Sequence, residues 1–226
     1  MGFIKFIDVG FSYPGQNKPV LQDVNLSIPK EGVTAVIGPN GSGKTTFSKL
    51  LMGILKPTGG LIRLDGEPLS SLNLAQTGRR VGYVFQNPGK QLFCETVEEE
   101  IGFGLQNLGL TPEQVSRKAR EIMEYFELTR YSQSFPLSLS TGEKRRLAIA
   151  AVLALEPDLL VLDEPTAGLD PYRKKLLGDY LERVIASQRG VVIISHDHRF
   201  INKYATRLIR LEGGQFAEVG PTGNHH

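Results

Sequence analysis

The chain has 226 residues, of which 40% are hydrophobic and 22% charged, and its 26 basic and 24 acidic side chains give a formal net charge of +2. This composition is ordinary for a globular protein and argues against a disordered or membrane-embedded chain. The balanced charge provides no global field that would attract nucleic acid. The length suffices for one substantial core, or for one core and a small subdomain.

The sequence has no feature typical of a membrane span, an export signal or a disulfide framework. The longest apolar run, 147–155, is half the roughly 18 residues that a membrane helix needs. The N-terminus lacks a basic stretch followed by a sustained apolar one, so we expect a cytoplasmic location. Cys94 is the only cysteine, and we interpret it as a packing residue rather than a nucleophile. The ending 223–226 resembles a purification-tag remnant after a single domain over 1–222.

The N-terminal part alternates short β-like runs with turns. Runs over 3–9 and 20–28 flank a turn that contains Tyr13, Pro14 and Gly15. This pattern predicts an antiparallel β subdomain. Considered by itself, Tyr13 is as well explained by packing as by contact with a ligand.

The segment 38–45 fits the pattern G-x-x-x-x-G-K-[ST] and follows the apolar, β-branched run 33–37. A strand, a glycine loop and a helix start in this order form a phosphate-binding P-loop. Glycines let backbone N–H groups turn toward phosphates, Lys44 supplies a positive charge, and the Thr45 hydroxyl can ligate Mg²⁺. An ordinary strand-to-helix turn is the alternative, which the complete pattern disfavours. The predicted nucleotide-binding residues are Gly38, Pro39, Asn40, Gly41, Ser42, Gly43, Lys44, Thr45 and Thr46.

Helices and strands alternate after the P-loop. Helical spacing over 45–55 ends at a cluster of proline and glycine, and strands are predicted over 61–64 and 80–85. Apolar residues then recur on one helix face, which predicts a small α-helical subdomain over about 87–138.

The second half of the chain predicts a buried sheet. A helix over 142–155 precedes the continuous apolar runs 159–162 and 191–194, which are typical of strands buried on both faces. Apolar runs over 208–211 and 215–219, separated by two glycines, predict a closing hairpin. The predicted fold class is therefore α/β, with a P-loop NTPase core around a mainly parallel sheet.

Candidate catalytic residues follow these strands directly. Ligands of open α/β sheets collect beyond the carboxyl ends of the strands. Asp163 would hold Mg²⁺, and Glu164 would orient or deprotonate the attacking water. The Gln86 carbonyl oxygen can reach the metal or that water, and a neutral His196 can contact the γ-phosphate. The structural alternatives are a solvated strand end, a plain loop amide and a satisfied histidine; His198 is interpreted as a surface residue.

Two segments carry a resemblance to a known family. The sequence Leu-Ser-Thr-Gly-Glu-Lys-Arg-Arg over 139–146, followed by Leu-Leu-Val-Leu-Asp-Glu-Pro over 159–165, resembles the ATP-binding cassette family. The order of motifs extends the resemblance over essentially the whole chain apart from the tail. It implies ATPase activity with a Mg²⁺ cofactor. It implies further that Tyr13 stacks on adenine, that Gln86 forms the Q-loop and that His196 is the switch histidine. Asp170 would lie in the D-loop at the dimer interface. The implied catalytic residues are Glu164, His196, Gln86 and Lys44, and the implied metal site is formed by Thr45, Gln86 and Asp163.

The resemblance also implies a second ATPase subunit. In that family the signature motif of one subunit closes over the P-loop of another, so Ser140, Thr141, Gly142 and Glu143 would act in trans. Thr141 and Glu143 depart from the commonest signature, Leu-Ser-Gly-Gly-Gln. Ser140 and Glu143 also fit a capping box at a helix start, which would turn the carboxylate back to the cap. A homodimer and a heterodimer both remain open.

A narrower resemblance concerns 84–93 and 96–104, which are similar to the energy-coupling-factor and cobalt-type uptake ATPases. It implies an integral-membrane transporter subunit docked near 87–105, uptake of a vitamin or a metal ion, and a peripheral location at the cytoplasmic face of the membrane. The family usually has an acidic residue where Gly89 or Lys90 stands here.

Two other classes compete with a transporter ATPase. A soluble cassette ATPase of DNA repair, chromosome architecture or translation usually carries a long coiled coil or two cassettes, neither of which the sequence has. A small-molecule kinase needs no signature motif, so 139–143 disfavours it. We predict no nucleic-acid partner, because the balanced charge offers no counterion-release drive.

Overall fold

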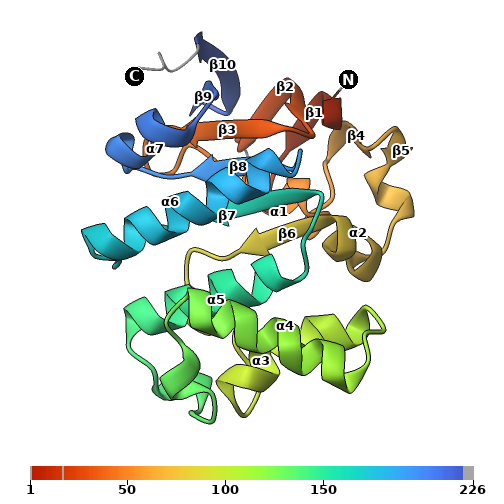
Figure 1. Ribbon diagram of the computed structural model, residues 1–226. Coiled ribbons are helices and arrows are strands. Elements are labelled where there is room, and N and C mark those ends of the chain that lie inside the picture. Colours follow the sequence, from red (N-terminus) through yellow and green to blue (C-terminus); the bar gives the residue numbers. More distant parts are fainter. Residues whose placement is uncertain (1, 17, 221–226) are drawn as a thin grey trace.

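The computed structural model describes residues 2–16 and 18–220. The predicted tag remnant at 223–226 and the predicted domain end at 222 lie outside the described residues. Figure 1 shows a larger sheet in the middle of the molecule, a smaller antiparallel sheet toward one end, and helices α3, α4 and α5 gathered below. The predicted α/β class is confirmed.

The larger sheet has the strand order β10-β9-β3-β8-β7-β6. The strands from β9 to β6 pair in parallel, and β10 pairs antiparallel with β9. The predicted mainly parallel sheet and the closing hairpin are therefore confirmed. The bounds are β3 Gly32–Ile37, β6 Val81–Val84, β7 Leu159–Asp163, β8 Gly190–Ile194, β9 Arg207–Glu212 and β10 Gln215–Gly220.

Both faces of strands β3, β6, β7 and β8 are buried, and the continuous apolar runs predict this for β7 and β8. In β7, Leu160 and Leu162 join the core cluster that also contains residues of α3 to α7, while Leu159 and Val161 join the cluster that contains α1 and the antiparallel sheet. Because successive side chains of a strand point to opposite faces, one uninterrupted apolar run supplies both cores.

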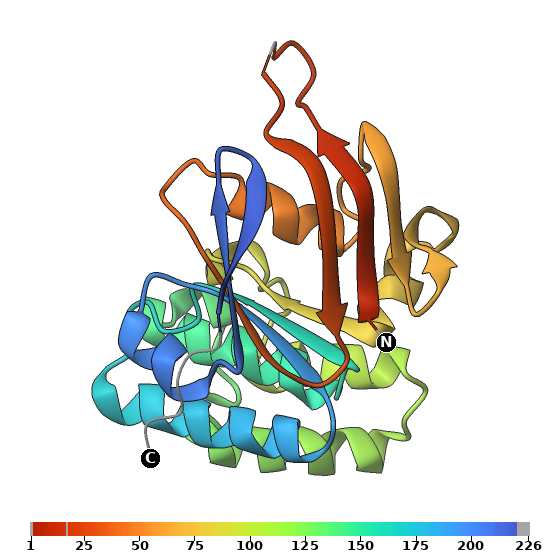
Figure 2. The ribbon, with the colours of Figure 1, turned by 90° about the horizontal axis from the view of Figure 1, so that it is seen from above.

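The antiparallel sheet has the order β2-β1-β4-β5, and helix α1 packs between it and the hairpin β9-β10 (Figure 2). Phe47 of α1 makes the link, with its ring centroid 5.1 Å from that of Phe6 and 4.8 Å from that of Phe216. The predicted N-terminal antiparallel subdomain is confirmed as a sheet. Its bounds are β1 Gly2–Phe11, β2 Leu21–Pro29, β4 Gly59–Leu64 and β5 Glu67–Pro68, and α1 spans Lys44–Leu51.

Helices begin at caps that the sequence displays. Thr96, Thr111 and Ser140 each form a capping box at the start of α3, α4 and α5, and Asp170 caps α6. Among the described residues, no helix is both long and apolar enough to span a bilayer. The remaining bounds are α2 Leu74–Arg80, α3 Val97–Asn107, α4 Pro112–Tyr125, α5 Thr141–Ala154, α6 Pro171–Ala186 and α7 His198–Tyr204.

Some predicted boundaries were wrong. Helix α1 ends at Leu51, short of the predicted end at 55, and Gly53 follows with a left-handed φ of 71°. Arg80 ends helix α2 instead of opening a strand, because the capping box of Asn73 and Gln76 starts a helical turn just before β6. No helix was predicted over the spans of α2, α6 and α7.

Candidate functional site

Most of the residues predicted to bind nucleotide, metal and water converge on one open cleft of about 870 Å³. Four parallel strands, β3, β6, β7 and β8, deliver their carboxyl ends to it, so segments far apart in the sequence meet there. The predicted residues that line the cleft are Tyr13, Asn40, Gly41, Gly43, Lys44, Thr45, Thr46, Gln86, Asp163, Glu164 and His196.

The P-loop wraps the first residue of α1. The Nζ of Lys44 donates hydrogen bonds to the carbonyl oxygens of Gly38 at 2.8 Å and Pro39 at 2.9 Å. Gly43 has φ of 106°, and a Cβ atom there would lie 3.1 Å from side-chain carbons of Leu21 and Val20, so glycine is required. Burial lowers the pKa of Lys44, although Glu164 and Asp163 act in the opposite direction. Lys44 is thus held by carbonyl oxygens of its own loop and lines the open cleft.

Two hydroxyl groups of the loop differ in their environment. The Oγ of Ser42 is buried and has no hydrogen-bond partner among the described residues. The Oγ1 of Thr46 lies 3.2 Å from the Oη of Tyr13. The Tyr13 ring packs edge-on against Phe11, with 4.9 Å between centroids. Tyr13 is therefore fixed to α1 at the margin of the cleft.

Asp163 ends β7 and is only 3% exposed. The Oη of Tyr83 donates to its Oδ2 at 3.3 Å, and the same Oη lies 2.8 Å from the Oγ of Ser48. Burial raises the pKa of Asp163 to about 6, against the hydrogen bond from Tyr83. A divalent cation would favour the ionised carboxylate, and Thr45 and Gln86, which line the same cleft, add the oxygen ligands that Mg²⁺ prefers. The donor set fits magnesium.

Glu164 follows β7 in a left-handed backbone conformation with φ of 50°. Its backbone N–H donates to the carbonyl oxygen of Ile194 at 2.8 Å, and its Oε2 accepts from the Oγ of Ser195 at 3.0 Å. The Nε2 of His196 lies 3.7 Å from its Oε1. Positive φ in a residue with a side chain is uncommon, and of the non-glycine residues described with it, Glu164 is the one that lines the cleft. The end of β8 therefore orients this carboxylate.

The signature residues do not line this cleft. Ser140 caps α5, and its Oγ and backbone N–H donate to the Oε2 of Glu143 at 2.7 and 2.9 Å. Tyr131 donates a short hydrogen bond to the other carboxylate oxygen. These hydrogen bonds lower the pKa of Glu143 to about 2, with that from Tyr131 contributing most. The predicted capping box is confirmed.

The predicted D-loop lies against the signature. A Cβ atom on Gly142 would be 3.2 Å from the carbonyl oxygen of Gly168. Asp170 caps α6, where it accepts from the backbone N–H of Arg173 at 2.9 Å and pairs with the Arg173 guanidinium. Thr141 is exposed at the start of α5, and His198 is exposed as predicted. Ser140, Thr141 and Asp170 are absent from the lining of the cleft, whereas Ala167, just before Gly168, is part of it.

Three residues to which the sequence analysis gave no role contact this machinery. Ser195 and Tyr83 hold the two carboxylates, and Arg145 reaches the cleft from α5. The position of Ser195 directly after an apolar strand is a signal that was available. Arg145 stands among basic residues before the apolar part of α5, and nothing in that pattern indicates which way its side chain points.

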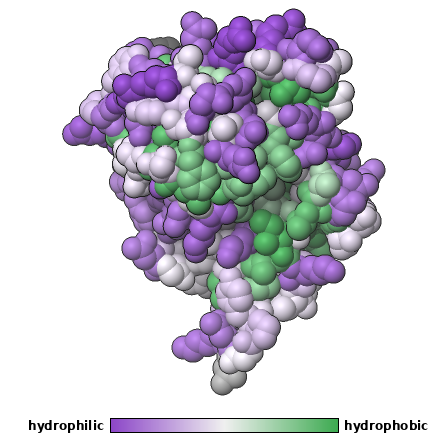
Figure 3. Space-filling model, turned by 90° about the horizontal axis from the view of Figure 1, so that it is seen from below, coloured by the Kyte–Doolittle hydropathy of each residue, from purple (hydrophilic) through white to green (hydrophobic). Residues whose placement is uncertain are grey.

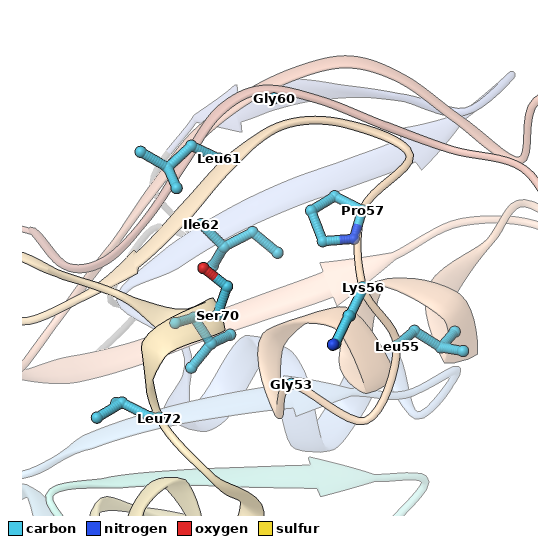
Figure 4. Close-up of a pocket in the computed structure, with 10 residues that line it drawn as sticks. Gly53, Leu55, Lys56, Pro57, Gly60, Leu61, Ile62, Ser70 and Leu72 are labelled. Atoms are coloured by element: carbon cyan, nitrogen blue, oxygen red, sulfur yellow. The ribbon is translucent and has the colours of Figure 1, made fainter.

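A second pocket of about 350 Å³ lies between the end of α1, strand β4 and the turn after β5 (Figure 4). Among the described residues that line it, Lys56 is the one ionisable group, and Leu55, Pro57, Ile62 and Leu72 supply apolar walls. It has neither a glycine loop nor a carboxylate, so it is not the nucleotide site.

Comparison with known proteins agrees with the geometry of the cleft. A family profile described as ABC transporter matches residues 21–167. The chain is 40% identical over 223 residues to the energy-coupling factor transporter ATP-binding protein EcfA of Methanothermobacter thermautotrophicus, covering 96% of this chain and 70% of that protein. It is 40% identical over 201 residues to an ABC transporter ATP-binding protein of Methanosarcina acetivorans, but spans only 33% of that relative's length.

Solved structures give the same result. The fold matches cbiO1 from Clostridium perfringens, described as part of the ABC transporter complex cbiONQ, with a TM-score of 0.81 and 30% identity over 96% of this chain and 87% of that one. It also matches a dimeric ATP-binding cassette bound to ADP and Pi, with a TM-score of 0.89 and 26% identity over 98% of this chain and 100% of that one. The family profile covers more than half of the sequence, and the chain belongs to the ABC transporter family of ATPases.

Proposed function

We propose that this chain is the ATP-hydrolysing subunit of an importer of the energy-coupling-factor or cobalt type, which takes up a vitamin or a metal ion. The observation that carries the proposal is the convergence of Lys44, Asp163 and Glu164 on one cleft. The similarity to EcfA and to cbiO1 supports the transporter class. The transported solute is a property of other subunits.

The cleft supports a division of labour in ATP hydrolysis. Lys44 would exchange its loop carbonyls for the β- and γ-phosphates, and Tyr13 would stack on adenine. Glu164, oriented by Ser195, would accept a proton from the attacking water. His196, beside that carboxylate, would contact the γ-phosphate, and Gln86 would orient the same water.

Magnesium fits the donor set of the cleft. Thr45, Asp163 and Gln86 would hold it. When bound with ATP, Mg²⁺ supplies positive charge that neutralises the charge developing on the phosphate oxygens. The buried position of Asp163 supports this assignment, because a bound cation compensates the burial of a carboxylate.

The complete ATP site would need a second cassette. The cleft of their own chain is not lined by Ser140, Thr141, Gly142 or Glu143, and a helix N-terminus is suited to an anion. We infer that they close over the phosphates held by a partner, with Asp170 at the same interface. The similarity to a dimeric ATP-binding cassette supports this arrangement and leaves homodimer and heterodimer open.

The surface around 87–105 supports docking of a membrane subunit. Phe93 is 63% exposed and Phe103 is 45% exposed, and their rings stack edge-on at 4.9 Å. An apolar groove of about 250 Å³ lies at the edge strand β6, where Ile54, Leu74 and Phe85 are among its lining residues. Apolar surface lies open on the face seen from below in Figure 3. None of the lining residues of this groove lies within 87–105, but Leu155, which lines it, lies close to Gly104. We propose that an integral-membrane subunit docks on 87–105 and that one of its apolar helices extends into this groove.

The single cysteine allows a direct test of this docking. Cys94 lies between Phe93 and helix α3, and burial raises the pKa of its thiol to about 11, so labelling with a photo-crosslinker requires alkaline buffer. We expect the labelled protein, trapped with ATP as the Glu164→Gln variant in native membranes, to crosslink to an integral-membrane protein.

A matched control moves the label. In a Cys94→Ser background, Glu31→Cys places the thiol in the exposed turn before β3, at the strand end opposite the cleft. This site should give no crosslink to a membrane protein. If the ATP-trapped protein labelled at Cys94 forms no crosslink to an integral-membrane protein, the importer proposal is wrong.

A further inference from the structure

The first half of helix α5 contains two consecutive buried arginines whose side chains contact different parts of the molecule. Arg145 and Arg146 are each 4% exposed. Arg146 donates to the carbonyl oxygens of Phe126 at 2.6 Å and Glu127 at 3.3 Å, at the end of α4. Arg145 instead reaches the nucleotide cleft. Arg146 therefore contributes to packing against the end of α4, whereas its neighbour Arg145 contacts the nucleotide cleft.

The Arg145 guanidinium joins two loops of the cleft. One nitrogen donates to the carbonyl oxygen of Gln86 at 2.6 Å. The other donates to the carbonyl oxygen of Glu164 at 2.9 Å, and more weakly to those of Phe85 and Asp163, each at 3.4 Å. A planar fork of donors can hold two segments at once, which the single ammonium of lysine does less well.

The charge of Arg145 lacks a direct ion pair. No carboxylate within the described part of the chain makes a salt bridge with it, and burial lowers its pKa while Asp163 and Glu164 raise it. Burying a guanidinium is unfavourable unless its donors are satisfied. Four carbonyl oxygens accept from its two terminal nitrogens, while its buried Nε has no hydrogen-bond partner among the described residues. Displacement of either loop would therefore leave further buried donors without an acceptor.

We propose that Arg145 is a positioning residue for ATP hydrolysis, which locks the backbone of Glu164 to the loop that carries Gln86. Glu164 has a strained backbone, its carboxylate is held by Ser195, and Arg145 holds its carbonyl end. Loss of this bridge leaves the phosphate-binding loop intact but releases the water-activating carboxylate. The proposal rests on ATP hydrolysis at this cleft and needs no membrane subunit.

The test separates ATP binding from turnover in the purified protein. Arg145→Lys keeps the charge and Arg145→Met keeps the apolar stem, and neither keeps the fork. We expect both variants to bind ATP within ~3-fold of the unmodified chain and to hydrolyse bound ATP at least ~10-fold more slowly, since a misplaced catalytic group costs rate more than affinity. Turnover of Arg145→Lys should exceed that of Arg145→Met by less than ~3-fold, because lysine restores the charge but not the fork of donors.

Arg146→Lys is the matched control for a purely structural effect. It changes an equally buried neighbour whose acceptors lie just after α4, so thermal stability should fall about as much as in Arg145→Lys while turnover stays within ~3-fold. Turnover of Arg145→Lys near that of the unmodified chain would overturn the proposal. Equal losses in Arg145→Lys and Arg146→Lys, or a parallel fall in ATP affinity, would overturn it too. Failure of the Cys94 crosslink would instead count only against the importer.

Discussion

The cleft and the start of α5 are both rich in polar groups, but they are satisfied in different ways. In the cleft, Lys44 rests on carbonyls of its own loop, Ser42 has a buried hydroxyl without a partner among the described residues, and Asp163 is buried beside Tyr83. At α5, Ser140 and Glu143 satisfy each other. The first region presents polar groups to an open cleft, whereas the second must break internal hydrogen bonds to bind a ligand.

The largest expected effect concerns turnover in the cleft. Glu164→Gln removes the proposed base but keeps a similar shape, so ATP hydrolysis should slow by at least ~10²-fold while ATP still binds. Single-turnover assays with labelled ATP measure both quantities. Asp158→Asn, just before the opposite end of β7, weakens two partly exposed ion pairs, with Lys30 and with Arg80, and should stay within ~3-fold. Near-normal turnover of Glu164→Gln would remove that residue from the mechanism.

Nucleotide affinity comes next. Lys44→Ala deletes a charge-assisted hydrogen-bond donor to phosphate, and the ATP dissociation constant should rise by roughly 10- to 10²-fold. Lys49→Ala removes the same charge from the last turn of the same helix, outside the cleft, and should leave affinity within ~2-fold. Equilibrium titration with a fluorescent ATP analogue distinguishes the two. Equal affinities in the two variants would invalidate the P-loop assignment.

A smaller effect is expected at the start of α5. Glu143→Gln keeps a side chain able to cap the helix but removes a negative charge from the surface that we propose closes over a partner's ATP. The ATP concentration that half-saturates cassette association should therefore fall by about 2- to 5-fold. Tyr131→Phe keeps the charge and should give no tightening. A weaker association of Glu143→Gln would show that the carboxylate assists the nucleotide instead of competing with it.

The smallest effect concerns acid stability. The pKa of Glu143 is about 2 in the folded chain, below its ordinary value of 4.5. Because the folded pKa is depressed, the stabilisation from this carboxylate is present above pH 4.5 and is lost as the pH falls toward 2. Urea unfolding should find Glu143→Gln less stable at pH 6, with the difference vanishing near pH 2. A difference independent of pH would assign the stability loss to packing.

Local patterns made the cleft predictable from sequence. The P-loop residues are contiguous, and Asp163 and Glu164 directly follow an apolar strand, so the strand-end rule places them together without knowledge of the fold. The cap of α5 was equally readable from Ser140 and Glu143. The start of α6 carried a similar signal in Asp170 and the proline after it, which the sequence analysis did not use.

Contacts between distant segments were not predictable. Arg145 binds carbonyl oxygens of Gln86 and Glu164, which are 59 and 19 residues away, and backbone acceptors leave no trace in the sequence. The hydroxyl of Tyr83 reaches Asp163 from a neighbouring strand, 80 residues away. A tyrosine in a strand and an arginine in a helix have many uses, and only the tertiary packing selects one.

The claim that two cassettes share each ATP site is tested most directly by the molecular mass of the Glu164→Gln protein in solution. Light scattering would measure this mass with and without ATP, for the protein alone and together with any cassette that co-purifies with it. We expect ATP to convert single cassettes into dimers, and Ser140→Arg, which blocks the start of α5, to abolish the conversion while leaving ATP binding intact. Single cassettes at saturating ATP, with or without a second cassette, would contradict a shared site.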